Sequence, residues 1–249
     1  AVGNVSGYLG EWVFSNVFIG DSAGYGNTGN NNVFLGQASG KANSGQYNSF
    51  MGYRAGAKNT GGSSNVFIGN QSGVSNLVGG DNVFLGTEAG FANTNGSFNT
   101  FVGYQTGHTN NASYNAFMGF KSGYSNLSGS NNVFMGFESG VKNTSGDANV
   151  FIGYKSGHQN TEGQRNVFIG IQSGLSNIAG NANVYIGENS GRASQTGSMN
   201  VFVGVQAGSD NEAGYRNVFL GAQSGGYNVG GNFNTFLGAV KRTYSSSIN

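Results

Sequence analysis

Two histidines are the side chains best suited to bind a metal ion or to carry a proton. His108 and His158 occupy the same position of a repeated unit, three units apart. If each unit contributes one strand to a sheet, a strand spacing of about 4.8 Å places them roughly 14 Å from each other, too far for one ion to bridge. We therefore expect no histidine metal site. Elsewhere the same position varies, as on an ordinary surface, and holds Tyr25, Lys41, Ala57, Val74 and Phe91.

Carboxylates and hydroxyls show no arrangement typical of catalysis. Glu138 and Glu162 share no register, so a glycosidase pair is not indicated. Serines fall mainly at a position reserved for small residues, which does not suit a catalytic triad. Repetitive calcium-binding rolls need aspartates in register, but here they occur singly, at Asp21, Asp81, Asp147 and Asp210. We expect a protein that is not an enzyme and has no cofactor, with structural calcium as an alternative that the scattered aspartates do not favour.

One glycine motif resembles a dinucleotide-binding loop. Residues 24–29 read G-Y-G-N-T-G, which fits G-x-G-x-x-G. Two of these glycines belong to the repeat, and no strand–helix–strand pattern surrounds them. We interpret the motif as part of the repeat.

An aromatic column is the strongest candidate for ligand binding. The residue after the strand glycine is aromatic in four successive units. Rings that face the solvent in a column can stack on the apolar faces of sugars. The column could instead pack between subunits or stack along the molecule, and the sequence leaves these alternatives open. The four residues are Tyr104, Phe120, Phe137 and Tyr154.

A repeat positions all of these residues. Each copy opens with Asn, has an aromatic residue two places on and an aliphatic residue three places on, and then Gly, so the unit is N-V-F-I-G-x-x-S-G-x-x-N-x-x-G-x-x. Copies are spaced by 17 residues, shortened to 16 in three places. Exceptions are few: Tyr185 replaces Phe, Ser194 replaces the second Asn, and Ala112 replaces the third Gly. The copies open at Asn16, Asn32, Asn48, Asn65, Asn82, Asn99, Asn115, Asn132, Asn149, Asn166, Asn183, Asn200, Asn217 and Asn234.

Composition excludes several classes of protein. The chain has 47 Gly, no Pro and no Cys, and glycine does not recur at every third place, which excludes collagen. Its 19 Phe and 12 Tyr supply more apolar surface than a disordered chain carries. A net charge of +1 gives no electrostatic reason to expect a nucleic-acid partner, and no apolar run is long enough to insert into a membrane.

A unit of this length suits one coil of a parallel β-solenoid, with one or two short strands and tight Gly/Asn corners. We expect an all-β molecule of about thirteen coils of 16–17 residues over 16–238, with asparagine columns sharing amide hydrogen bonds along the axis. Residues 1–15 form a partial, irregular first coil, in which residues 1–7 align with the F-I-G-x-x-S-G stretch and Trp12 and Phe14 plug or bridge the coil. Residues 239–249 form a tail or link, and both ends look cut from a longer fibre.

The strand sequence is apolar on both faces, because side chains alternate along a strand. One face must fill the narrow coil, and the other would expose a long apolar stripe unless another chain covers it. We therefore expect a side-by-side homo-oligomer, with three copies favoured and a larger ring left open. The sequence does not say which face is interior. Core or intersubunit aromatic residues of the strand include Phe18, Phe34, Phe67, Phe84, Phe151, Phe168 and Phe219.

The repeat resembles the head repeats of YadA-type trimeric autotransporter adhesins. Residues 65–69 (NVFIG) and Ser72 match their strand and following small residue. Residues 48–56 (NSFMGYRAG) and 99–107 (NTFVGYQTG) resemble the N-T-F-I-G-Y-x-A-G repeats of fibre proteins that end in a self-cleaving chaperone domain, phage-type tail fibres among them. The resemblance implies a left-handed β-roll, a homotrimer, an extracellular, cell-surface or virion location and a role in attachment. This chain differs in its longer unit and in having Phe where the adhesin heads have Ala.

We therefore expect a structural or adhesive segment of a surface fibre, which attaches to host or prey cells or to glycans as part of a longer filament. A passive spacer without a ligand is the alternative among structural proteins. Ice binding is a further alternative, although it normally needs regular threonine columns, and threonine is scattered here.

Overall fold

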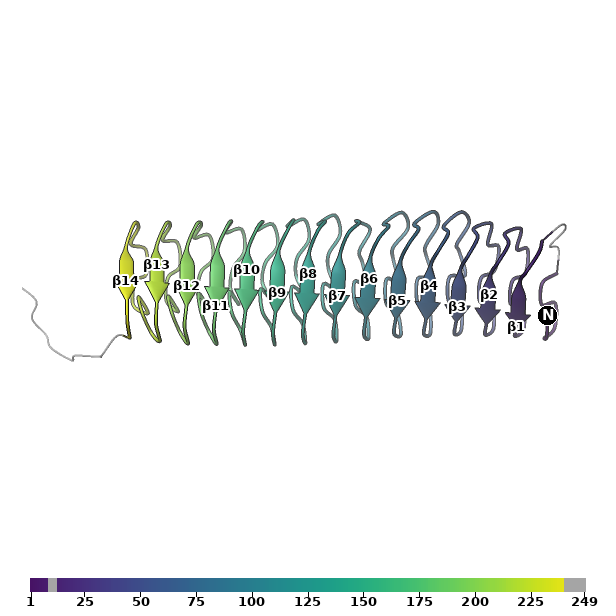
Figure 1. Cartoon of the computed structure of the whole chain (residues 1–249), viewed down its shortest axis with the longest axis horizontal. Helices are drawn as coiled ribbons and strands as arrows, with labels where there is room; N and C mark the ends of the chain where they lie inside the picture. Colours follow the sequence, from purple (N-terminus) through teal and green to yellow (C-terminus); the bar gives the residue numbers. More distant parts are fainter. Residues whose placement is uncertain (9–12, 240–249) are drawn as a thin grey trace, which may run out of the picture.

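The protein is a rod built from one strand per coil. Its structure, a computed structural model, describes residues 1–8 and 13–239. In them, fourteen three-residue strands form a single parallel sheet whose order follows the chain (Figure 1). This confirms the expected all-β solenoid. The strands are β1 (Val17–Ile19), β2 (Val33–Leu35), β3 (Ser49–Met51), β4 (Val66–Ile68), β5 (Val83–Leu85), β6 (Thr100–Val102), β7 (Ala116–Met118), β8 (Val133–Met135), β9 (Val150–Ile152), β10 (Val167–Ile169), β11 (Val184–Ile186), β12 (Val201–Val203), β13 (Val218–Leu220) and β14 (Thr235–Leu237).

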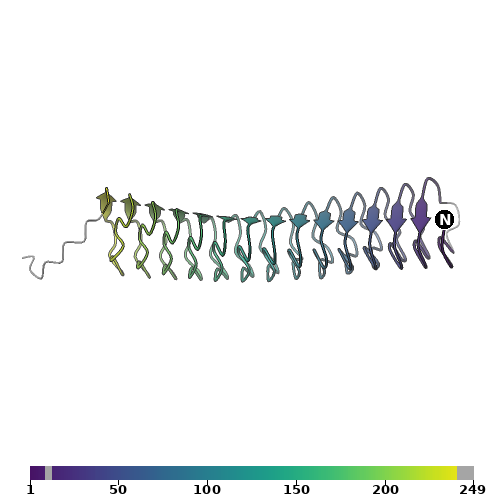
Figure 2. The same cartoon turned by 90° about the horizontal axis from the view of Figure 1, so that it is seen from below.

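Equivalent residues of successive coils lie in register along the whole rod. Val17 pairs with Val33, and the pairing continues without a slip to Thr235 in β14. The 16-residue coils keep the same register, since Thr100 pairs with Ala116 across one of them. Figure 2 shows the coils stacked along the axis, with the strands turning gradually about it. Every repeat position therefore forms a column that runs the length of the molecule.

The start of the chain continues this stack. Val2 forms a parallel bridge with Ile19, its amide donates to the carbonyl of Phe18 at 2.8 Å, and its carbonyl accepts from Gly20 at 2.7 Å. This is the alignment that the sequence predicts for residues 1–7. Phe14 is exposed, whereas Trp12 and residues 240–249 lie outside the described residues.

The middle residue of each strand fills the coil. From β1 to β13 this aromatic side chain is buried, and neighbouring rings stack with centroids 4.7 to 5.2 Å apart. The opposite wall has room only for small residues. A Cβ on Gly73, for example, would lie 2.6 Å from the Phe67 ring, and the backbone there has φ +55°. The aromatic rings can therefore be accommodated only because the residue across the coil is glycine.

Buried polar columns complete the interior. Serine hydroxyls on the opposite wall donate to strand carbonyls of the next coil, as Ser122 Oγ does to Phe134 O at 2.9 Å. Because such a bond satisfies a buried hydroxyl, serine can take the place of alanine in this column. Every complete coil buries the small residue of this column.

Two asparagine columns tie the coils together. In the strand ladder, formed by the asparagines that open the copies, each backbone amide donates to the preceding Oδ1, as Asn65 does to Asn48 at 2.9 Å. In the turn ladder, formed by the second asparagine of each copy, the side-chain amides bond directly at most steps, as Asn143 Nδ2 does to Asn126 Oδ1 at 2.6 Å. The expected amide bonding along the axis is confirmed. These hydrogen bonds also satisfy most of the polar groups that are buried inside the narrow coil.

Candidate functional surfaces

The outer side of the sheet is a continuous apolar surface. It consists of the first and third residues of strands β1 to β14, and we call it the sheet face. Its side chains are mostly Val, Ile, Leu and Met. Several are well exposed: Val17 is 49% exposed, Ile19 43% and Met118 47%. The sheet face therefore repeats in every coil of the described residues.

The phenylalanines predicted to lie in the core or between subunits lie inside the single chain. Phe18 is 5% exposed and the other six are fully buried. They are therefore occupied by packing within the coil. This decides which face of the strand is interior: the aromatic residue points inward, and the aliphatic residues on either side of it form the sheet face.

The aromatic column is present as a stack of parallel rings. Centroids of Tyr104 and Phe120 lie 5.4 Å apart, those of Phe120 and Phe137 5.0 Å, and those of Phe137 and Tyr154 5.4 Å. The four side chains are 38–46% exposed. Since Phe120 and Phe137 each have a ring on both sides, these two present their edges to the solvent. Of the arrangements considered from the sequence, the structure contains stacking along the rod.

Glutamate–histidine pairs lie on the wall opposite the sheet. Glu88 Oε2 lies 3.5 Å from His108 Nε2, and Glu138 Oε2 lies 3.3 Å from His158 Nε2. Burial lowers the pKa of both histidines, and the neighbouring glutamates oppose this shift only in part. Lys155 Nζ also approaches Glu138, at 3.4 Å. The histidines therefore stay neutral over more of the acidic range than an exposed imidazole does.

Sequence reasoning missed these pairs, although their signal was present. In both, the glutamate precedes the histidine by 20 residues, which is one coil plus three positions. In a solenoid that spacing places the two side chains in adjacent coils and neighbouring columns. Glu138 and Glu162 share no register, whereas Glu138 and His158 lie in adjacent coils and in contact.

Two further features of the described residues bear on function. Among residues 1–8 and 13–239, no group of three or more His, Asp or Glu side chains lies close enough to hold a metal ion. Within the same ranges no helix is long and apolar enough to cross a membrane.

The apolar sheet face, the stacked aromatic column and the charged wall opposite the sheet are thus distinct surfaces of one rod. Comparisons with protein families, with curated proteins and with solved structures found no match to this chain.

Proposed function

We propose that this chain is a structural and adhesive segment of an extracellular surface fibre, of a cell or a virion, in which parallel copies pack side by side through their sheet faces. The role is not catalytic. The rod gives the fibre length and stiffness, and its outward columns are available for attachment to cells or glycans. A passive spacer would share the packing and lack the attachment.

The observation that carries this proposal is the apolar sheet face. Only one side of each strand is sealed by the coil, so the aliphatic side chains on the other side stay half-buried or exposed from β1 to β14. At a strand spacing of about 4.8 Å this band is roughly 60 Å long. Soluble monomers rarely expose continuous apolar patches of more than a few hundred Å², and larger ones mark interaction sites.

A second copy of the same chain is the partner that fits the band best. Another rod repeats at the same coil spacing, so its side chains meet equivalent side chains in every coil, as closed symmetric assemblies require. Three copies around one axis is our proposed number, which follows the resemblance to trimeric adhesin heads. Membrane insertion and nucleic-acid binding are not part of the proposal.

Native mass spectrometry of the chain, with light scattering in parallel, tests the association. The wild type should be an oligomer, and the mass gives the number of copies. The double variant Met118→Lys and Met135→Lys places two charges on the sheet face, where these side chains are 47% and 38% exposed. It should dissociate into monomers, because burying unpaired charges in an interface is costly.

A matched control comes from the same coil as Met118. Leu127 is 59% exposed but lies in the turn after the second asparagine, away from the strand. Leu127→Lys should leave the oligomer intact. A wild-type chain that remains monomeric at protein concentrations of tens of micromolar would contradict the proposal.

A further inference from the structure

A polar notch interrupts the wall opposite the sheet, near the C-terminal end of the rod. One column of this wall carries large side chains in several coils, ending with His158, Leu175 and Arg192. The next two coils have Ser209 and Gly226 at this position. Two successive small residues open a gap about two coil spacings long, roughly 10 Å. The resulting notch has a volume of about 240 Å³.

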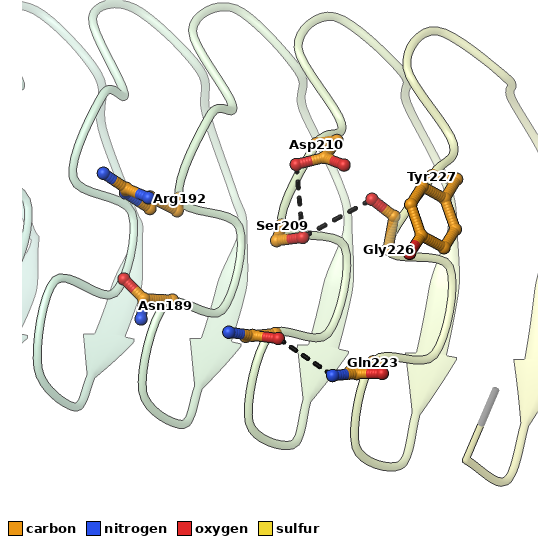
Figure 3. A pocket seen from close by; sticks show the side chains of 8 residues that line it. Asn189, Arg192, Ser209, Asp210, Gln223, Gly226 and Tyr227 are labelled. Atoms are coloured by element: carbon orange, nitrogen blue, oxygen red, sulfur yellow. Dashed lines mark hydrogen bonds between the residues drawn. The ribbon is translucent and has the colours of Figure 1, made fainter. Parts of the chain in front are cut away.

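Three neighbouring coils line the notch (Figure 3). In this view Arg192 and Tyr227 stand on either side of Ser209. The Ser209 hydroxyl lies 3.3 Å from Asp210 Oδ1 and 3.4 Å from the Gly226 carbonyl, which fixes the floor. Gln223 Nε2 donates to Gln206 Oε1 at 3.1 Å along the lower edge. The walls therefore present amides, one guanidinium, one carboxylate and one phenol within a single ring-sized space.

Beside the notch, one buried acceptor makes no hydrogen bond. Asn189 Oδ1 is buried and has no hydrogen-bond partner among the described residues. The exposed carboxylate of Asp210 and the guanidinium of Arg192 add a strong acceptor and several donors.

We infer that this notch binds one neutral hexose unit of a glycan. Amide side chains offer a donor and an acceptor together, which suits adjacent hydroxyl groups, and the Tyr227 ring, 58% exposed, can receive the C–H face of a sugar ring. Anions fit less well, because Arg192 is balanced by Asp210. Drug-sized ligands fill pockets of about 300–1,000 Å³, so this notch is sized for a single ring.

The inference rests on the attachment role proposed above and names a site for it. It does not depend on the number of copies, because the notch lies on the wall that faces the phenylalanine rings from across the coil rather than on the sheet face. An oligomer that fails to bind sugar and a monomer that binds it are therefore distinguishable results.

Saturation-transfer NMR tests the site, since it observes the sugar whatever the size of the rod. D-galactose, D-glucose, D-mannose and N-acetyl-D-glucosamine are each added to the full chain. At least one should receive saturation, with a dissociation constant on the order of 1 mM, as expected for one ring in an open polar site. Ser209→Leu should weaken binding at least tenfold, because leucine refills the column as Leu175 does one coil before Arg192.

Ala57→Leu is the matched control, since it adds a side chain at the same repeat position in a coil without the notch. It should bind as the wild type does. Asp210→Ala removes an exposed acceptor without filling space, and should weaken binding severalfold even if Ser209→Leu proves unstable. The inference fails if none of the four sugars receives saturation, or if both notch variants bind as tightly as Ala57→Leu.

Discussion

The hydroxyl of Tyr185 lies 2.8 Å from the Oγ of Ser194 inside the coil. These residues are exceptions to two different columns, and they occur in the same coil. Burial raises the pKa of Tyr185 far above its ordinary value, so the phenol stays protonated at any ordinary pH. The shorter serine leaves room for the extra oxygen. It also interrupts the turn ladder, and Asn177 Oδ1 and Asn211 Nδ2, on either side of the break, make no hydrogen bond.

The two exceptions should therefore be energetically coupled. Tyr185→Phe should cost about 1 kcal/mol, because it leaves the Ser194 hydroxyl buried without its partner. Ser194→Asn should cost about 1–3 kcal/mol, because the amide competes with the phenol for space. The double variant restores the column pattern and should be at least as stable as the wild type. Urea unfolding of all four proteins measures the coupling, which is absent if the single changes simply add.

The turn ladder should be sensitive to loss of a single amide. Asn143→Ala removes bonds of 2.6 Å to Asn126 Oδ1 and from Asn160 Nδ2, and one of 3.0 Å to Gly146 O. Leaving these buried groups unpaired should cost about 3 kcal/mol. Asn70→Ala, at an exposed position, should change the free energy of unfolding by less than about 0.5 kcal/mol. Equal effects at the two sites would mean that the ladder adds no stability.

Glycine should be required where a Cβ would be crowded, as at Gly73, and replaceable where there is open space, as at Gly230. Gly73→Ala places a Cβ 2.6 Å from the Phe67 ring at φ +55°, and the combined strain should cost about 3 kcal/mol. A Cβ on Gly230 has nothing within 4 Å. Gly230→Ala should therefore be neutral within about 0.5 kcal/mol. Circular-dichroism melts of the two variants make the comparison.

The rod should lose stability as the pH falls from 7.5 to 5. Burial lowers the folded-state pKa of His108 and of His158 below the ordinary value of histidine. The unfolded chain therefore binds more protons in this range, and unfolding becomes easier as the pH drops below about 6.5, levelling off below the folded pKa. The variant with His108→Phe and His158→Phe should show a smaller loss in thermal melts at both pH values. An unchanged pH dependence in that variant would contradict the assignment.

The coil architecture was predictable because one signal repeats in every unit. Asparagine, aromatic residue and glycine recur at fixed places, so period and strand position follow directly, and residues 1–7 fall into the same frame. The orientation of the strand was not predictable from its own letters, since both of its faces are apolar. What decides it is the opposite wall, where Gly73 and its equivalents bring the backbone so close to the ring that a Cβ would crowd it.

Backbone conformation was only half visible in the sequence. Glycine marks two positions of each coil with positive φ, but two further positions adopt it with other residues, as Arg54 does at 54° and Phe98 at 59°. A non-glycine residue in this region costs roughly 1–2 kcal/mol. A backbone bond to the preceding coil holds it there: the Arg54 amide, for example, donates to the Gln37 carbonyl at 2.9 Å. The sequence does not reveal these positive-φ positions, because hydrogen bonds between coils, rather than a particular residue type, stabilise the conformation.

The candidate sites were the least predictable, because they depend on neighbouring columns rather than on one column. The aromatic column is visible along a single repeat position. The Glu88–His108 pair and the notch beside Ser209 appear only when adjacent coils are set side by side.

Because coils of 16 and of 17 residues pair in the same register, the length of the rod depends on the number of coils and not on the number of residues. The difference of one residue lies in the turn before the third glycine, and the next strand still pairs in register with its neighbour. Adding or deleting one complete unit would change the length by one step of about 4.8 Å and leave the cross-section unaltered. Reach and surface can thus be tuned separately in such a rod.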